Sequence, residues 1–519
     1  MHHRARTRAP RAAPAPPVEH DADVLAGFLS DAAHVPGGYT SGVTFPDSED
    51  AVSAAVAGAG SVLPIGAQSS LTGGATPRGE LLLSTRRLTA IGALSDDTID
   101  VGAGVSLAEL HRHLAVRHMI YPPAPTYEGA FVGGTIATNA AGAGTFKYGS
   151  TRDWVSALTV VLANGEILDI ERGQTLADDG AFEVILAAGA RVHISVPSYR
   201  MPAVRKLSAG YFARPGMDLV DLFVGSEGTL AVIVSARLRV IARPLRYVAL
   251  IRCADETQAL SVTGALRREA GEAWHGNGPL DIAAIEYMDR NSLATVPDHA
   301  FERAGVQRPR DASVLLLVQI ETGLEAAKGS AALERLATVL AAQRVADDPH
   351  LAEPSDARAA ERLIELREAV PASVNAAVSA TKARVHPDIQ KTAGDMIVPF
   401  ERLADSIALY RRAFADRHLD HAIWGHVSDG NLHPNVLPRS LDDVRRGEEA
   451  IVEIARGVLA MGGAPLAEHG VGRSRIKQRL LNEMYGEAGI EQMRAVKRAL
   501  DPTWKLAPGV LFPAPSNAA

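Results

Sequence analysis

A glycine-rich stretch over residues 40–245 limits the possible folds more than any other feature, because short apolar runs alternate there with tight turns. Runs of this length, rich in branched apolar residues, predict strands. They are SVLPIG, LLLST, TIDVGAGV, LTVVLAN and GTLAVIVSARLRVI. Two further segments, SEDAVSAAVAGA and LAELHRHLAV, repeat apolar residues at the helical period. We therefore expect an α+β or α/β domain here.

The pattern changes after Arg243-Pro244. Strands are predicted in YVALIRC, DIAAIEYM and ASVLLLVQI, and long amphipathic helices separate them. Further helices are predicted over 354–382, 400–418 and 440–461, and a last one ends at Asp501-Pro502 because proline cannot continue a helix. This rhythm predicts a separate second domain, a sheet with helices on one side.

Size and composition exclude several classes of protein. A chain of 519 residues is too long for one ordinary core. Its formal charge of −7 gives no reason to expect nucleic acid as a partner. Cys253 is the only cysteine, which excludes a disulfide within the chain and an iron–sulfur cluster held by its own thiolates.

The N-terminal residues 1–17 are basic and rich in Ala and Pro, without the apolar centre of a secretory signal, so we expect a disordered tail. No uninterrupted apolar run reaches membrane-spanning length. We expect a cytoplasmic protein without a transmembrane segment, and peripheral contact with a membrane is left open.

Two histidines, His426 and His433, flank an Asp-Gly pair, which favours a two-residue hairpin turn. With Asp429 and Gly430 at the turn, the two histidines face each other with Cβ atoms roughly 4.5–5.5 Å apart. Glu468 could then complete a His-His-Glu set for a divalent metal. A polar hairpin with two half-exposed histidines fits the stretch equally well.

Two glycine-rich loops, over 64–74 and 133–142, carry small and hydroxyl residues. Such loops bring backbone N–H groups close to phosphates, and the second could aim a helix N-terminus at a pyrophosphate. Neither is a Walker loop, because the Gly-Lys-Ser/Thr ending is missing. A tight turn explains one such loop, but two loops followed by GSEGT at 225–229 favour a cofactor site.

Over residues 38–513 the chain resembles a known family. VLPIGAQSSLTGG, YPPAPTYEGAFVGGTIATNAAGAGTFKYGSTRDWV and DLFVGSEGTLAVI resemble the FAD-binding domain of the vanillyl-alcohol-oxidase/p-cresol-methylhydroxylase superfamily. LREAVP, KTAGDMIVP, GHVSDGNLHPN, AEHGVG and RALDPTWKLAPG resemble its FAD-linked D-2-hydroxyacid dehydrogenases. That branch includes D-lactate dehydrogenase, the glycolate oxidase flavin subunit and D-2-hydroxyglutarate dehydrogenase.

The resemblance implies an α+β fold in which an antiparallel sheet with helices forms a substrate (cap) domain. The implied division is a disordered tail over 1–17, a FAD-binding domain over 18–243, a substrate domain over 244–461 and a C-terminal segment over 462–519. The last segment is expected to return to the FAD domain and complete the active site.

The resemblance also implies which residues contact FAD. They are Gly66, Gln68, Ser69, Ser70, Leu71, Thr72, Gly73, Pro125, Thr126, Gly133, Gly134, Asn139, Gly142, Tyr148, Gly149, Glu227, Gly228 and Ile233. Relatives that bind FAD covalently use a histidine of this domain, and none lies within 64–74 or 119–192. Noncovalent FAD is therefore expected.

For the chemistry, the resemblance implies a divalent metal, zinc or a similar ion, on His426, His433 and Glu468. His469 matches the proposed base, and Asn435 another polar site residue. Arg367 matches the arginine that grips the substrate carboxylate, and Lys391 a second carboxylate contact. These types suit the oxidation of a 2-hydroxy acid, in which a base takes the hydroxyl proton while hydride leaves for the flavin.

The expected activity is oxidation of a small D-2-hydroxy acid, such as D-lactate, D-2-hydroxyglutarate or glycolate, to the 2-oxo acid. The expected electron acceptor is external: a quinone, a cytochrome, an electron-transfer flavoprotein or an iron–sulfur partner. A homodimer is left open. The alternatives are an alkyl-dihydroxyacetone-phosphate-synthase-like flavin transferase and a non-catalytic flavin subunit of a larger complex.

Overall fold

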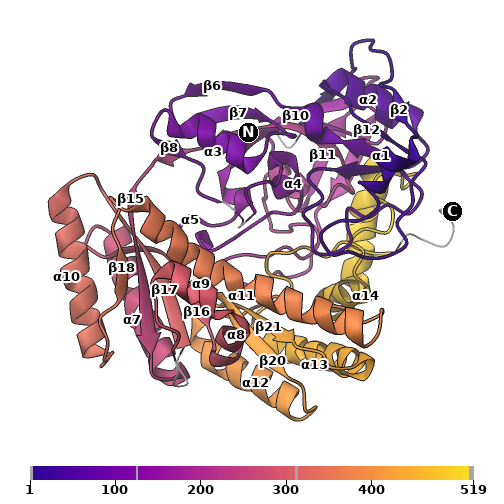
Figure 1. The fold of residues 1–519 in the computed structure, drawn as a ribbon. Coiled ribbons are helices and arrows are strands. Elements are labelled where there is room, and N and C mark those ends of the chain that lie inside the picture. Colours follow the sequence, from indigo (N-terminus) through magenta and orange to yellow (C-terminus); the bar gives the residue numbers. More distant parts are fainter. Residues whose placement is uncertain (1–3, 124, 126, 310–313, 514–519) are drawn as a thin grey trace.

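The computed structural model describes residues 4–123, 125, 127–309 and 314–513. The chain forms two α+β parts, one at the top and one at the bottom of Figure 1, and the last helix lies against the upper part. The mixed α+β fold with two parts, expected from the sequence, is confirmed.

The N-terminal part holds two main sheets. The smaller has the order β2 (Val18–Glu19), β3 (Gly42–Thr44), β5 (Leu81–Ser84) and β4 (Val62–Ile65), and its last three strands are parallel. The larger has the order β12 (Arg191–Ser195), β11 (Ala181–Ile185), β1 (Arg4–Arg8), β10 (Ile167–Glu171), β9 (Val155–Val161), β13 (Val232–Arg239), β7 (Thr98–Gly102) and β6 (Ile91–Ser95). A short pair joins β8 (Met119–Ile120) to β14 (Ile241–Ala242).

Short helices connect these strands. They are α1 (Ala22–Ala26), α2 (Glu49–Gly58), α3 (Leu107–Ala115), α4 (Val132–Ala137), α5 (Thr145–Tyr148) and α6 (Leu219–Phe223). The two predicted helices of this part, α2 and α3, are confirmed. Each begins at a serine cap, and Ser106 and Glu109 form a capping box at α3, which satisfies free N–H groups of the first turn.

The expected disordered tail over 1–17 is wrong at Arg4–Arg8, which form β1 inside the larger sheet, between β10 and β11. Small and arginine side chains alternate along this strand, so Ala5 and Thr7 are buried while the arginines point outward. The guanidinium of Arg8 then pairs with Glu49 and Asp169, at 2.8 and 2.7 Å. The arginines of residues 4–8 thus belong to a strand whose neighbours include acidic side chains.

The second part is built on one antiparallel sheet. Its order is β18 (His350–Ala352), β15 (Leu245–Cys253), β17 (Val314–Thr322), β16 (Asp281–Met288), β20 (His421–His426), β21 (Asn431–Val436) and β19 (Met396–Ile397). Its helices are α7 (Glu256–Trp274), α8 (Arg290–Thr295), α9 (Asp298–Ala304), α10 (Ala326–Ala342), α11 (Ala357–Arg384), α12 (Leu403–Ala415) and α13 (Leu441–Ala460).

The prediction of helices on one side of this sheet is wrong, because helices cover both faces. Leu250 and Leu317 point to a core shared with α8, α9 and α11. Ile251 and Val318, their neighbours along the strands, point to the opposite core with α7, α10 and α12. Unbroken apolar runs such as that of β17, where both faces are buried, are the sequence sign of this arrangement.

The C-terminal segment returns to the N-terminal part. Its helix α14 (Arg475–Leu500) ends before Pro502 as predicted, and Val62 N donates to Lys505 O at 2.8 Å beside β4. Figure 1 shows α14 in yellow beneath the upper part. Among the described residues, no helix combines the length and apolarity that crossing a bilayer requires. The domain boundaries at 243 and 461 stay predictions.

Candidate functional site

The hairpin that carries the two histidines has a different register from the predicted one. His426 lies opposite Asn431, and His433 lies opposite Trp424. A 3-10 turn (η4, Val427–Asp429) and the left-handed Gly430 lengthen the connection, so the two-residue turn and the direct pairing are wrong. The histidines are diagonal neighbours on one sheet face, and their ring centroids are 5.6 Å apart.

The segment that carries Glu468 lies beside β19. Ile397 and Ala464 exchange two backbone hydrogen bonds of 2.8 Å. Just before β19, Asp395 turns its carboxylate to the end of this segment, where Oδ2 accepts the backbone N–H groups of Glu468 at 2.8 Å and His469 at 2.9 Å. These contacts bring β21 and the 464–469 segment to one place.

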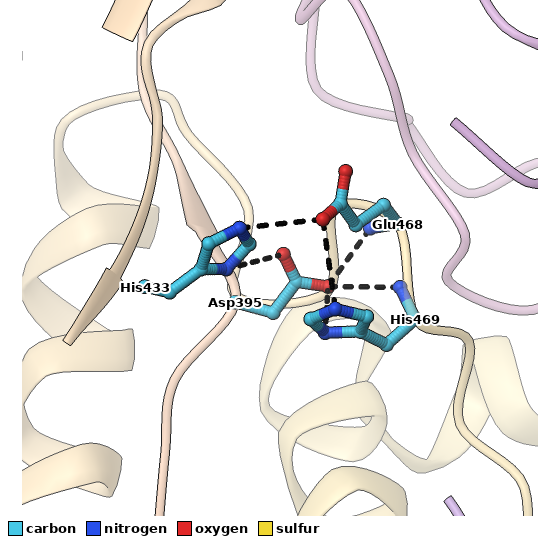
Figure 2. Close-up of side chains that lie close together, drawn as sticks. All are labelled: Asp395, His433, Glu468 and His469. Atoms are coloured by element: carbon cyan, nitrogen blue, oxygen red, sulfur yellow. Dashed lines mark hydrogen bonds and ion pairs between the residues drawn. The ribbon is translucent and has the colours of Figure 1, made fainter. Parts of the chain in front are cut away.

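Three imidazoles converge on one carboxylate oxygen. Oε1 of Glu468 lies 3.5 Å from Nε2 of His426, 3.3 Å from Nε2 of His433 and 3.5 Å from Nε2 of His469. Figure 2 shows His433, His469 and Asp395 around Glu468. The His469 side chain is 31% exposed, while those of His426, His433 and Glu468 are at most 8% exposed. His469 is thus the histidine most open to a ligand.

The donor types and spacings fit a divalent ion. Bonds of about 2.0–2.1 Å in a tetrahedral site place neighbouring donors roughly 3.3 Å apart. A second, overlapping group also exists: Asp395, His433, Glu468 and His469 each offer one donor, and these donors lie within 4.8 Å of one another. Asp395 was missed in the sequence, where its only sign was a carboxylate immediately before a short apolar strand.

Burial and charge set the protonation of this cluster. Burial lowers the pKa of His433 to about 4, which leaves a neutral imidazole near pH 7. Burial opposes protonation of His426 as well, but the Glu286 carboxylate raises its pKa to about 9. Burial would raise the pKa of Glu468, yet Lys206 and His426 hold it well below its usual range. A divalent ion bound at His426 must therefore displace a proton.

Lys206 is a site residue that the sequence did not reveal. It reaches from the N-terminal part into the cluster, where its fully buried ammonium lies 2.8 Å from Glu468 Oε2 and 3.3 Å from Asp429 Oδ2. Burial would lower the pKa of Lys206, but these carboxylates raise it. The ion pair occupies Oε2 of Glu468 and leaves Oε1 to the histidines.

The structure gives Arg367 a different partner from the predicted substrate carboxylate. Its Nε donates to Oε2 of Glu286 at 2.5 Å, and its Nη1 donates to Glu368 at 3.1 Å. Glu368 is the next residue in the chain, whereas Glu286 lies 81 positions away. These contacts do not test the predicted contact of Arg367 with the substrate carboxylate, which stays a prediction.

Two lysines lie at the edge of the cluster. Lys391 is exposed, its Nζ lies 5.9 Å from the Trp424 ring, and no carboxylate pairs with it among the described residues. Although the side chain as a whole is exposed, burial of its ammonium end and the charge of Lys477 lower the pKa of Lys391 to about 8. Nζ of Lys477 donates to the carbonyl of Gly470 at 3.2 Å. Lys391 is therefore the positive group at this edge that has no carboxylate partner among the described residues.

Asn435 lies two residues beyond His433 on β21. Its Nδ2 donates to the carbonyl of His433 at 2.8 Å. Its Oδ1 is buried and has no hydrogen-bond partner among the described residues. Such an orphaned acceptor is normally satisfied by a ligand or water.

The predicted FAD residues come from separate segments that meet. A Cβ built at Gly66 would lie 3.8 Å from Cα of Gly134, and one at Gly228 would lie 3.5 Å from Pro64. Glu227 N donates to Ala137 O at 2.8 Å. The loop over 66–73, the 133–149 stretch and the entry to β13 therefore surround one region, although Thr126 lies outside the described residues.

This region has open space where a cofactor needs it. A Cβ at Gly134 would have no described atom within 4 Å, whereas one at Gly133 would lie 2.6 Å from Cβ of Ala103. Close packing thus requires glycine at position 133, whereas Gly134 leaves open space, called here the Gly134 cradle. In the first loop Leu71 is 49% exposed, and Ser69 and Ser70 are half-buried, so small polar groups remain accessible there.

Other predicted FAD residues are engaged within the protein. Gln68 Nε2 donates to carbonyls of Phe28 and Ala75, both at 2.9 Å, which holds the first loop. Glu227 accepts the backbone N–H groups of Val471 and Gly472, both at 2.8 Å. Burial raises the pKa of Glu227 to about 7. Its carboxylate thus ties the C-terminal segment to the N-terminal part.

The remaining predicted contacts lie in the 139–149 stretch and on β13. Asn139 is bound on both sides, to Leu207 O at 3.1 Å and to Arg152 N at 3.0 Å. The Tyr148 hydroxyl donates to Glu321 of the second part. Roles in FAD binding stay predictions for the whole predicted set.

Comparison with known proteins agrees with this arrangement. Residues 40–171 match the family model described as FAD binding domain, and residues 245–511 match the C-terminal domain of FAD linked oxidases. D-2-hydroxyglutarate dehydrogenase of Xanthomonas citri pv. viticola is 30% identical over 494 residues, covering 92% of this chain and 90% of the relative. The chain belongs to the FAD-linked oxidase family. It is a FAD-dependent oxidoreductase.

Other relatives carry related names. Glycolate oxidase subunit GlcD of Bacillus subtilis is 28% identical over 457 residues, covering 87% of this chain and 83% of the relative. D-lactate dehydrogenase of Archaeoglobus fulgidus is 28% identical over 458 residues, covering 86% and 84%. A solved alkyldihydroxyacetonephosphate synthase shares the fold, with a TM-score of 0.56 at 15% identity, over 90% of this chain and 75% of that one.

Proposed function

We propose that the protein oxidises a small D-2-hydroxy acid to the 2-oxo acid and passes the electrons from reduced FAD to an external acceptor. The observation that carries the proposal is the convergence of His426, His433 and His469 on one oxygen of Glu468. The names of the relatives, which are dehydrogenases or oxidases of D-lactate, D-2-hydroxyglutarate or glycolate, support the substrate class.

FAD is the hydride acceptor, held without a covalent bond by the residues around the Gly134 cradle. In the proposal, His426, His433 and Glu468 hold a divalent ion, zinc or a similar metal, which supplies Lewis acidity to the substrate hydroxyl. The protein's own residues orient the substrate and remove its hydroxyl proton. His469, open to the ligand and backed by Asp395 at 3.2 Å, takes the hydroxyl proton on a ring nitrogen.

The substrate carboxylate is assigned to Lys391, whose ammonium has no carboxylate partner among the described residues and attracts an anion by charge. Asn435 is kept as another polar residue of the site, where its buried Oδ1 can accept a hydrogen bond. Arg367 is a further contact proposed for the substrate carboxylate, because its contacts with protein carboxylates use only Nε and Nη1.

The decisive experiment is anaerobic bleaching of the bound flavin. D-lactate, D-2-hydroxyglutarate and glycolate are added in turn, with the L-enantiomers of the chiral acids as matched controls, and absorbance of oxidised flavin is followed. The expected result is rapid bleaching by at least one D acid or by glycolate, and none by L acids. If a broad 2-hydroxy-acid panel leaves the flavin oxidised while an acyl-dihydroxyacetone phosphate reacts, the transferase reading replaces this one.

A further inference from the structure

A buried line of side chains connects helix α11 to His426. Glu286 on β16 lies directly opposite His426 on β20 in the sheet register. Its Oε1 is 2.5 Å from Nδ1 of His426, and its Oε2 accepts from Nε of Arg367 at 2.5 Å. Both carboxylate oxygens are therefore committed, one to each neighbour.

Water has little access to this line. The side chains of His426, Glu286 and Arg367 are 5%, 3% and 8% exposed. In such surroundings hydrogen bonds to charged groups are short and strong, and turning the carboxylate would leave a buried charge unpaired. Arg367 therefore holds Glu286 in the orientation that meets Nδ1 of His426.

The ring orientation matters because the two imidazole nitrogens have different neighbours. A carboxylate at Nδ1 keeps a proton there, which leaves the lone pair of Nε2 for a metal. Nε2 is the nitrogen that faces Oε1 of Glu468. Without Glu286 the ring could exchange its tautomer or turn about its side-chain bonds.

We propose that Glu286, held by Arg367, is a positioning residue that presents Nε2 of His426 to the metal site. In this arrangement Arg367 acts on His426 through Glu286. This inference rests on the proposed function, because it takes His426 as a metal ligand. Local charge supports it: the guanidinium of Arg367 is itself fixed between the carboxylates of Glu286 and Glu368, so it gives Glu286 a fixed partner.

The first test is zinc affinity of the purified FAD-loaded protein, stripped of metal and titrated with Zn²⁺ against a chelator. Loss of a carboxylate behind a metal-binding histidine typically costs 10–100-fold in metal affinity, so E286Q should weaken zinc binding by about that factor. E368Q is the matched control, since Glu368 contacts the same Arg367 but not His426. It should bind zinc within about threefold of wild type.

The second test separates the two roles of Arg367. If it acts through Glu286, R367K changes zinc affinity, and adding R367K to E286Q changes it no further. If it only grips substrate, R367K raises KM while zinc affinity stays at the wild-type value, and that outcome overturns the proposal. E286D, which keeps the charge but shortens the reach, replaces E286Q should the latter not fold; it too should weaken zinc binding.

The outcomes also separate this inference from the proposed function. If wild-type protein, E286Q and E286D all bind zinc equally tightly, the positioning role of Glu286 is contradicted but the proposed function is not. Wild-type protein that binds no zinc removes both. Flavin absorbance of each variant serves as a check that FAD remains bound.

Discussion

The two carboxylate oxygens of Glu468 have different partners. Oε1 faces three histidine nitrogens, while Oε2 is taken by the buried ammonium of Lys206 at 2.8 Å. The backbone N–H of the same residue is held by Asp395. A carboxylate restrained at two points has little freedom left, so the position of Oε1 is set before any ligand binds.

The role of His469 gives the first prediction. H469A should keep FAD and metal but lose about 10²–10⁴-fold in the rate of flavin reduction, because a positioned base contributes that much. Stopped-flow bleaching and metal analysis on the same sample measure both. A variant that reduces at the wild-type rate contradicts the base assignment. Loss of metal instead would place His469 in the ligand set with Asp395 and His433.

Lys391 gives a prediction on pH. Its pKa is lowered to about 8 by burial and by Lys477, so the charged form is lost as pH rises through that value in the free enzyme. If its ammonium attracts the substrate carboxylate, KM should be flat below pH 8 and rise above it, while kcat changes less. K391R, whose guanidinium stays charged, should keep KM low up to pH 9. A KM profile identical in both proteins would argue against the contact.

At the scale of elements, the residues after His469 join the C-terminal segment to Glu227 and to the first glycine-rich loop. Backbone N–H groups of Val471 and Gly472 bind Glu227, and Arg473 N donates to Thr72 O at 3.1 Å in the first glycine-rich loop. Gly472 has a φ of 56°, and its Cα faces Thr72 closely. One short segment thus connects His469, the proposed base, to the first glycine-rich loop.

Replacement of Gly472 should therefore damage FAD binding. A Cβ there would lie 2.2 Å from Oγ1 and 2.6 Å from the carbonyl oxygen of Thr72, so the loop must move. We expect G472A to weaken FAD binding at least tenfold, measured by fluorescence of released flavin. G462A is the control, because Gly462 has a similar positive φ of 79° but open space around it, and should cost only about 1 kcal/mol of stability.

At the scale of the whole molecule, buried charges join the two parts. Glu321, on β17 of the second sheet, is 1% exposed and binds Lys147 at 2.8 Å and Arg246 at 2.7 Å. The Tyr148 hydroxyl donates to the same carboxylate, and Lys147 also reaches Asp281 at 2.6 Å. Since Lys147 and Tyr148 belong to α5, this cluster connects the N-terminal part to the second part.

Breaking this cluster should lower stability in a pH-dependent way. E321Q should cost about 3–5 kcal/mol at pH 7, as expected when one partner of a buried ion pair is removed. Burial would raise the pKa of Glu321, but Arg246 and Lys147 lower it below its usual value. Its contribution is therefore complete above about pH 4.5 and is lost as pH falls further.

Urea unfolding of wild type and E321Q at pH 7 and pH 4 measures this difference. The gap in unfolding free energy should narrow at pH 4. E325Q, which changes an exposed glutamate that is 70% accessible, should match wild type at both values. A gap of the same size at both pH values would contradict the assignment of the stability to the ionised carboxylate.

Much of this molecule could be read from local sequence. The helices α2, α3 and α14 and the strands β4, β5, β7, β9, β13, β15, β16 and β17 follow from periodicity and turn residues that lie close together in the chain. Each depends on interactions within a few residues, which a short window of sequence records. Membership of the FAD-linked oxidases follows from motifs of the same kind.

Only the tertiary structure decided the partners of those residues. Lys206 meets Glu468 across 262 positions of the chain, Glu286 meets His426 across 140, and Arg367 meets Glu286 across 81. No local pattern encodes such contacts, because they arise when separate segments pack and buried charges must find partners. The sequence alone determined which chemical groups the site contains, and packing over long distances decided which of them face a ligand and which hold the others in place.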